Sequence, residues 1–205
     1  MGVIITESVE ELIDKDESLE KNKKQKEYLD YIAEHRFNVL KAFNMFFLPL
    51  LNQEESFHFK SQISDEEFKE AIKTCAINIL DHDASKYGDD EFDGYREKYY
   101  PTSVEKARED FEKQSEERAE KAWESHYTHN PHHPLYWKDD ANGGYKDMQL
   151  EYIIEMICDW ASFSLKNGDI GELYKWYRDE AGKEKSQMTD KTRLIVEELI
   201  DKFVK

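Results

Sequence analysis

The residues best suited to chemistry in this sequence are an adjacent histidine and aspartate, His82 and Asp83. They stand in the run DHDASK at residues 81–86, at the end of a stretch whose apolar residues repeat with helical spacing. A neutral imidazole beside a carboxylate at a helix end can bind one divalent cation through nitrogen and oxygen, or bridge two cations. A His-Asp pair also occurs by chance, as a helix cap beside a half-buried histidine, so the interpretation depends on the other candidates.

Four of the seven histidines fall within eight residues, at His126, His129, His132 and His133. Pro131 lies in this stretch and Pro134 directly follows it, and these prolines would stiffen the backbone and keep the imidazoles in place. The simpler interpretation is a polar loop of stacked rings, but a histidine density this high is typical of ligand chemistry. The stretch therefore predicts a metal-binding loop, and it leaves the choice between His126 and His129 open.

Two further candidates lie inside apolar helical patterns. His35 is on the apolar face of an expected helix, between Ile32 and Val39, where a single histidine is usually a hydrogen-bonded core residue. Asp159 lies in the run IIEMICDWASF, and burying a carboxylate among such residues is costly unless a cation accompanies it. Asp159 therefore predicts a partner charge or a metal ion, and His35 is a further candidate ligand.

Helices must position these side chains, because the long stretches rich in Glu and Lys contain few turn-forming residues. The sequence has 8 Gly and 4 Pro among 205 residues, which favours helices over strands and turns. Ser64 followed by Glu67 is a capping-box signature and predicts the start of a helix. The expected helices cover about residues 22–48, 64–82, 104–126, 148–165, 170–180 and 189–203.

Each of the first three expected helices should bury one stripe of side chains. The stripes are Tyr28, Ile32, His35, Val39, Phe43 and Phe46 in the first helix, Phe68, Ile72, Cys75, Ile79 and His82 in the second, and Ala107, Phe111, Ala119 and Trp123 in the third. Residues 84–101, between the second and third helices, are rich in Gly and Tyr and predict turns.

The composition predicts a folded, all-α protein with a single domain. The hydrophobic fraction of 39% and the aromatic fraction of 13% exceed those of disordered chains, and 205 residues can bury a core without disulfides. We expect one domain over residues 1–205, with a core of about residues 22–180. Residues 1–20 should form an acidic arm or short helix, and residues 187–205 a terminal amphipathic helix.

The net charge of −17 limits the partners that this protein is expected to have. It repels nucleic-acid backbones, so general DNA or RNA binding is not expected, and anionic substrates would need a metal or local cations. Cys75 and Cys158 lie in apolar stretches, and we expect them to be buried and reduced. Neither a signal peptide nor an apolar run of about 18 residues is visible. We therefore expect a cytoplasmic protein without membrane contact.

The order of the candidates, a His, a His-Asp pair, a His, a His-His pair and an Asp, resembles the HD-domain superfamily of metal-dependent phosphohydrolases. The most similar subgroup is HD-GYP, the cyclic-dinucleotide phosphodiesterases, in which a Lys follows the His-Asp pair by three residues, as Lys86 does here. The run HHPLYW at residues 132–137 is similar to the loop that a His-His pair opens in that subgroup. The resemblance covers roughly residues 30–165, although the run GGYK at residues 143–146 lacks the Pro that follows Gly-Tyr in HD-GYP proteins.

The HD-domain resemblance implies a helical fold of the HD type with one or two divalent transition-metal ions, Mn, Fe or Zn. It implies that the ligands of a first ion are His35, His82, Asp83 and Asp159. Asp83 would bridge to a second ion, whose further ligands would be His126, His132 and His133. A metal-activated water would then hydrolyse a nucleotide or another phosphoester.

The same resemblance implies which residues act in catalysis and which bind the substrate. Asp83 and Lys86 would be the catalytic residues. The three cationic residues Lys86, Arg96 and Lys98 would bind the phosphate of the substrate. These cations and the metal would let an acidic protein accept a phosphorylated small molecule or nucleotide.

Other functions remain open on the same residues. One is a di-iron oxygenase of the HD type, because a similar His/Asp set can activate O₂. Another is a non-enzymatic acidic interaction protein with a structural metal site. The runs HDASK, HHPLYW and EMICDW also resemble an uncharacterised domain-of-unknown-function family of bacteria and phages, which implies no activity.

Overall fold

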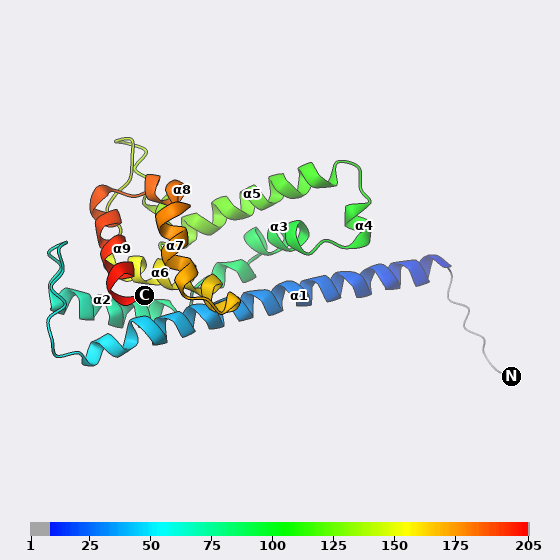
Figure 1. Ribbon diagram of the computed structural model, residues 1–205. Coiled ribbons are helices and arrows are strands. Elements are labelled where there is room, and N and C mark those ends of the chain that lie inside the picture. The colour runs from blue at the N-terminus through cyan, green and yellow to red at the C-terminus, as the bar shows by residue number, and fades with distance from the viewer. Residues whose placement is uncertain (1–8, 205) are drawn as a thin grey trace. The chain divides into compact units, whose positions relative to one another are not determined.

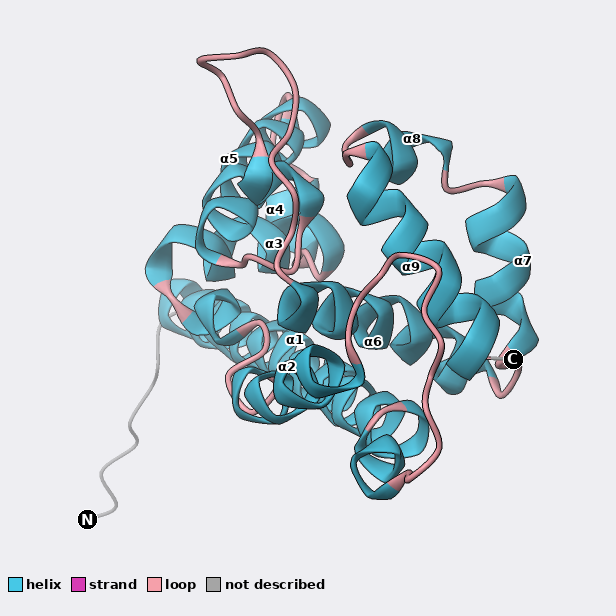
Figure 2. Cartoon of the chain, turned by 90° about the vertical axis from the view of Figure 1, so that its left-hand side faces the viewer, coloured by secondary structure: helices cyan, strands magenta, loops and turns pink. Residues whose placement is uncertain are grey.

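The computed structural model describes residues 9–204, and their side chains from residue 14 onward. This part of the chain consists of helices joined by loops and turns (Figures 1 and 2). Within it no strand forms, and Lys138 and Tyr145 make one isolated bridge. The prediction of an all-α fold is therefore confirmed. No helix in the described residues has both the length and the apolar character needed to cross a membrane.

The helices follow one another along the chain with short connections. They are α1 (Val9–Phe46), η1 (Leu48–Asn52), α2 (Asp65–Asn78), η2 (Ala84–Tyr87), α3 (Asp89–Tyr99), α4 (Ser103–Lys106), α5 (Phe111–His129), η3 (Pro134–Trp137), α6 (Leu150–Asn167), α7 (Gly171–Asp179), α8 (Gly182–Ser186) and α9 (Asp190–Phe203), where η marks a 3-10 helix. The chain packs into two compact units. Unit 1 lies within Met1–Ala33 and Lys86–Ser125, and unit 2 within Glu34–Ser85 and His126–Lys205. The prediction of a single domain stays a prediction.

The first helix begins earlier than its apolar pattern predicts. α1 starts at Val9, whereas the expected start is about residue 22. Residues 9–21 have only a weak apolar pattern, but they are rich in the helix formers Glu, Lys and Leu and contain no Gly or Pro. Helix propensity therefore extends α1 through much of the predicted arm, and residues 1–8 of that arm lie outside the described residues. The predicted stripe from Tyr28 to Phe46 is buried, with at most 8% exposure.

Residues 84–101 form the turn η2 and the helix α3, where the sequence predicts turns alone. Asp89, Asp90 and Glu91 fill the first turn of α3, where the helix dipole stabilises acidic side chains. Gly94 allows close packing within unit 1, because a Cβ atom there would lie 2.8 Å from the backbone oxygen of Arg118 in α5. The prediction of turns is wrong because this glycine serves a helix–helix contact.

The long charged helix expected from about residue 104 is divided into α4 and α5. The side chain of Thr102 caps α4 by accepting a hydrogen bond from the backbone N–H of Glu105. Asp110, just before α5, lies in the left-handed region with a φ of 61°, a conformation that ends a right-handed helix. The prediction of a single helix over these residues is therefore wrong.

The stripe predicted for this segment is correct at two of its four positions. Phe111 and Ala119 are buried, whereas Ala107 and Trp123 are exposed. The buried positions of α5 are Phe111, Ser115, Ala119, Ala122 and His126. Because these positions recur every three or four residues, the helical phase that buries Phe111 also buries His126 in the last turn.

In unit 2, α6 contributes most of its residues to the hydrophobic core. It packs against α2, α7 and α9. α2 begins at the predicted capping box, in which Ser64 and Glu67 exchange side-chain and backbone hydrogen bonds. The residues of α6 that are at most 1% exposed include Ile153, Ile154, Met156, Ile157 and Cys158. Polar side chains on this helix are therefore fixed in place by the packing around them.

In unit 1, Tyr28 and Ile32 of α1 pack with Tyr95 of α3 and Ala122 of α5.

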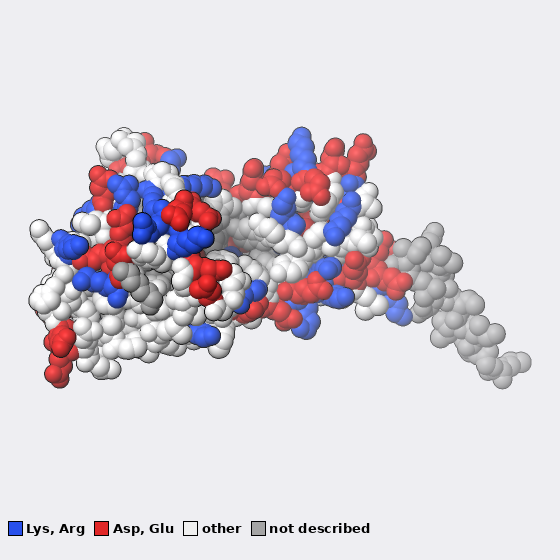
Figure 3. All heavy atoms as spheres, in the orientation of Figure 1, with Lys and Arg blue, Asp and Glu red and all other residues white. Residues whose placement is uncertain are grey.

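Charged residues cover much of the surface that Figure 3 shows. Figure 3 shows acidic and basic side chains interspersed on the face in view.

Candidate metal centre

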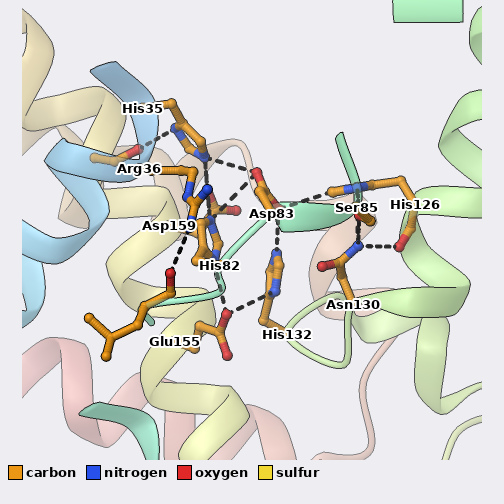
Figure 4. A network of polar contacts seen from close by, with 12 residues as sticks. His35, Arg36, His82, Asp83, Ser85, His126, Asn130, His132, Glu155 and Asp159 are labelled. Carbon is orange, nitrogen blue, oxygen red and sulfur yellow. Dashed lines mark hydrogen bonds and ion pairs between the residues drawn. The ribbon is translucent and has the colours of Figure 1, made fainter. Parts of the chain in front are cut away.

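Unit 2 brings all seven predicted metal ligands into one cluster (Figure 4). They come from α1, the turn after α2, the last turn of α5, the turn before η3, and α6. The residues are His35, His82, Asp83, His126, His132, His133 and Asp159. His129 is exposed and is not part of the cluster. The choice between His126 and His129 therefore falls on His126.

The first group of ligand atoms comes from His35, His82, Asp83 and Asp159. The Nε2 atom of His35 lies 3.1 Å from Asp159 Oδ1, 3.2 Å from Asp83 Oδ2 and 3.4 Å from His82 Nε2. His82 Nε2 lies 3.6 Å from Asp83 Oδ2 and 3.8 Å from Asp159 Oδ1. Metal–ligand bonds of about 2.0–2.2 Å place neighbouring nitrogen and oxygen ligands roughly 3–3.5 Å apart. These four atoms therefore have nearly the spacing that a single ion needs.

The second group uses the other oxygen of Asp83. Asp83 Oδ1 lies 3.3 Å from His126 Nε2 and 3.5 Å from His132 Nε2. A ring nitrogen of His133 completes a group whose ligand atoms all lie within 4.8 Å of one another. Among the described residues, the buried Nε2 atom of His132 has no hydrogen-bond partner. Since a buried polar atom is costly to leave unsatisfied, this nitrogen fits a metal ligand.

Asp83 holds its position through an uncommon backbone conformation. Its φ is 56°, in the left-handed region, and it lies in the turn that follows α2. Aspartate is one of the few residues besides glycine that adopts this region at modest cost. Non-glycine residues in this conformation occur often at functional sites, where the surrounding structure maintains them. The carboxylate that faces both groups thus comes from a strained turn.

Hydrogen bonds on the far side of two rings, those of His35 and His126, orient them toward the cluster. Ser162 Oγ lies 3.2 Å from His35 Nδ1. The side chains of Asn130 and Ser85 lie 3.1 Å and 3.4 Å from His126 Nδ1. These contacts fix the orientation of the two rings and leave each Nε2 atom directed at the cluster.

Glu155 is the residue of this site that the sequence interpretation missed. It is buried, at 4% exposure, and its Oε1 atom accepts hydrogen bonds from the Nδ1 atoms of His82 and His132. The sequence did contain a signal for Glu155, because this residue precedes Asp159 by one helical turn in the same apolar run. The cost of burying a carboxylate applies equally to both residues.

The buried charges of the cluster shift the pKa values of its members. Burial opposes the charged form of His82, but Asp83, Asp159 and Glu155 outweigh it and raise the pKa of His82 to about 10. Contacts with Asp159 and Asp83 raise the pKa of His35 in the same way, against the effect of burial. Burial also opposes ionisation of the two acids. The facing histidines nevertheless hold the pKa of Asp159 well below its usual range and lower that of Glu155 to about 2.

Metal binding should release protons and weaken as the pH falls. Without an ion, His35 and His82 hold protons because their pKa values are raised, and an ion must displace them. We expect the apparent affinity for Mn²⁺ to rise about tenfold per pH unit from about pH 6 to about pH 9 through the proton that His82 loses, and more steeply wherever His35 is also protonated. Calorimetric titrations in two buffers of different ionisation enthalpy count the protons. An affinity that stays constant over this range would exclude these imidazoles as ligands.

The cations predicted to bind phosphate lie in unit 1. Lys86 is half-buried in η2, three residues after Asp83. Arg96 forms a bidentate ion pair with Glu105, at 2.6 Å and 2.7 Å, and Lys98 pairs with Glu116. Arg96 and Lys98 would have to give up these partners to bind a phosphate. Their predicted role in phosphate binding stays a prediction.

Together these features define an all-α protein with a buried histidine–carboxylate cluster whose spacing suits divalent cations. The profile of a family described as "Family of unknown function (DUF5662)" matches residues 24–202, and the chain belongs to this family. The predicted likeness to a family of unknown function is thus confirmed. Comparison with the curated proteins gave no match, and comparison with the solved structures gave none either. The resemblance to HD domains stays a prediction.

Proposed function

We propose that this protein is a metal-dependent phosphohydrolase that acts on a nucleotide or another phosphoester. The observation that carries the proposal is the position of Asp83, whose two carboxylate oxygens each face a separate group of ligand atoms. A pair of ions that share a carboxylate is a common arrangement in enzymes that displace groups at phosphorus. The order of the ligands along the chain, which resembles that of HD domains, adds to this support.

The donor atoms fit the proposed ions. Imidazole nitrogens and carboxylate oxygens suit Mn²⁺, Fe and Zn²⁺, and the cluster contains no thiolate, because Cys75 and Cys158 are buried apolar-core residues. When bound, such an ion acidifies a coordinated water and so supplies a nucleophile near neutral pH. The buried thiols also support the reducing, cytoplasmic location that the sequence predicts.

The side chains of the cluster have separate tasks in this proposal. His35, His82 and Asp159 hold one ion, His126, His132 and His133 hold the other, and Asp83 serves both. Burial of these groups excludes water, and their electrostatic interactions with an ion or a phosphate become stronger in the low local dielectric. Lys86 contacts the phosphate of the substrate as a positive point charge.

Elemental analysis and a substrate screen test the proposal together. Protein purified without added metal is analysed for bound ions and then assayed against nucleotides, cyclic dinucleotides and simple phosphoesters. Chelated protein, with and without restored Mn²⁺, serves as the control. We expect phosphate release that chelation abolishes and metal restores. An iron-dependent absorption band that responds to O₂ would favour the oxygenase alternative. No turnover, with metal still required for folding, would favour the structural-metal alternative.

Lys86→Ala should keep its metal and lose most of its turnover. Losing one charge-assisted contact of about 1.5–3 kcal/mol predicts a fall of roughly ten- to a hundredfold in rate. The rates of wild type and variant are compared at matched metal occupancy, with the best substrate of the screen. Lys41→Ala, at an exposed lysine of α1, is the control and should retain full activity. Equal activity of the Lys86 variant and wild type would remove this residue from the site.

A further inference from the structure

A single carboxylate oxygen contacts histidines from both groups of ligands. Glu155 Oε1 lies 2.9 Å from His82 Nδ1 and 3.3 Å from His132 Nδ1. Figure 4 shows these contacts converging on Glu155 below the two rings. Within the described residues, the ion pairs of Glu155 are with these two histidines, and no lysine or arginine joins them. Its buried charge is thus balanced by the cluster alone.

We propose that Glu155 is a positioning residue shared by the two metal sites, an inference that rests on the proposed metal centre. A hydrogen bond from Nδ1–H to a carboxylate fixes the proton on that nitrogen, and the Nε2 atom then offers its lone pair to an ion. His82 Nε2 belongs to the first group and His132 Nε2 to the second. One carboxylate therefore sets the tautomer and the direction of a ligand in each site.

The placement of Glu155 on α6 supports this role. The residues beside it, Ile154 and Met156, are 0% and 1% exposed, so the helix cannot shift to bring the carboxylate to solvent. Asp159, a ligand of the first group, lies one turn further along the same helix. A single rigid helix thus carries both a ligand and the side chain that orients two others.

A third metal ion between Glu155, His82 and His132 is the competing interpretation, because their atoms also lie within 4.8 Å of one another. Both rings would then have to bind ions through both nitrogens, which requires each imidazole to lose its second proton. A carboxylate at hydrogen-bond distance from Nδ1 needs that proton to stay in place. The geometry therefore favours positioning over direct ligation.

Calorimetric titration of apo protein with Mn²⁺ tests the inference, using Glu155→Gln and two matched variants. We expect two equivalents in wild type, and in Glu155→Gln a fall of about ten- to a hundredfold in affinity at both sites. Ser162→Ala should weaken the first site alone, because Ser162 contacts His35. Glu151→Gln, the same change one turn earlier on α6, should alter neither site.

Each other result has a separate meaning. If wild type binds no divalent ion, the proposed function fails and this inference fails with it. If wild type binds two ions and Glu155→Gln binds them as tightly, or loses affinity at one site alone, only the inference is overturned. Three equivalents in wild type, with one lost in the variant, would make Glu155 a ligand.

A second measurement uses wild-type protein and remains informative if the variant does not fold. Long-range ¹H–¹⁵N correlation spectra of the Zn²⁺-loaded protein report which ring nitrogen of each histidine carries the proton. We expect the Nδ1–H tautomer for both His82 and His132. A proton on Nε2 of either ring would overturn the inference.

Discussion

Asp83→Ala should bind neither metal ion. The two oxygens of Asp83 face different groups of ligands, at 3.2 Å from His35 Nε2 and 3.3 Å from His126 Nε2, so one truncation removes a ligand from each site. His82→Ala, by contrast, removes a direct ligand from the first site only. The metal content of the purified protein, measured by elemental analysis, should therefore fall to background for Asp83→Ala. For His82→Ala it should be reduced but not abolished.

Exposed neighbours provide the controls for these two variants. Asp81→Ala and His129→Ala make the same chemical changes at exposed positions outside the cluster, and should keep the wild-type metal content. Circular dichroism checks that all four proteins are folded. If Asp83→Ala retained a full complement of ions, the assignment of both sites would be wrong.

Removing the metal should lower the melting temperature of the wild type, and an apolar residue at position 159 should remove the part of that effect that comes from the first site. An ion at a thousand times its dissociation constant stabilises the folded state by about 4 kcal/mol, which corresponds to roughly 8–16 °C for a chain of this size. Asp159 is 8% exposed in an apolar helix, so its carboxylate is costly without a cation. Asp159→Leu should therefore fold without metal, and chelator should lower its melting temperature by less than that of the wild type, because only the second site still binds an ion.

Asp159→Asn separates the charge of this side chain from its shape. It should lower metal affinity while leaving the packing of α6 unchanged, because the amide has nearly the volume of the carboxylate. Differential scanning calorimetry with and without chelator gives both readouts. A wild-type melting temperature that does not respond to chelator would exclude Asp159 as a ligand.

Helical phase made most of the candidate site predictable from the sequence. His35 and Asp159 fall on buried faces because the apolar residues around them repeat every three or four positions. His82 and Asp83 follow the buried stripe of α2, although they lie in the turn beyond Asn78 and not in the helix itself. The sequence pattern fixes which face a residue occupies, and that was enough to bring these ligands together.

What the pattern could not supply was contact across separate segments. Glu155 was missed because an acidic residue in a helix is usually taken as solvent-facing, and its two histidine partners lie far away in the sequence. The helix around Gly94 was missed for a similar reason. This helix depends on packing within unit 1, in which α3 approaches the backbone of Arg118, and local propensity does not encode this contact.

The ligands of the first group lie on segments that are widely separated along the chain, from α1 to α6. A bound ion would therefore act as a cross-link that closes long loops in the folded chain, much as a disulfide does. Neither α1 nor α6 could then detach without breaking a metal–ligand bond. The lifetime of the loaded protein, and its resistance to proteolysis, would be governed by the rate at which the ion is released.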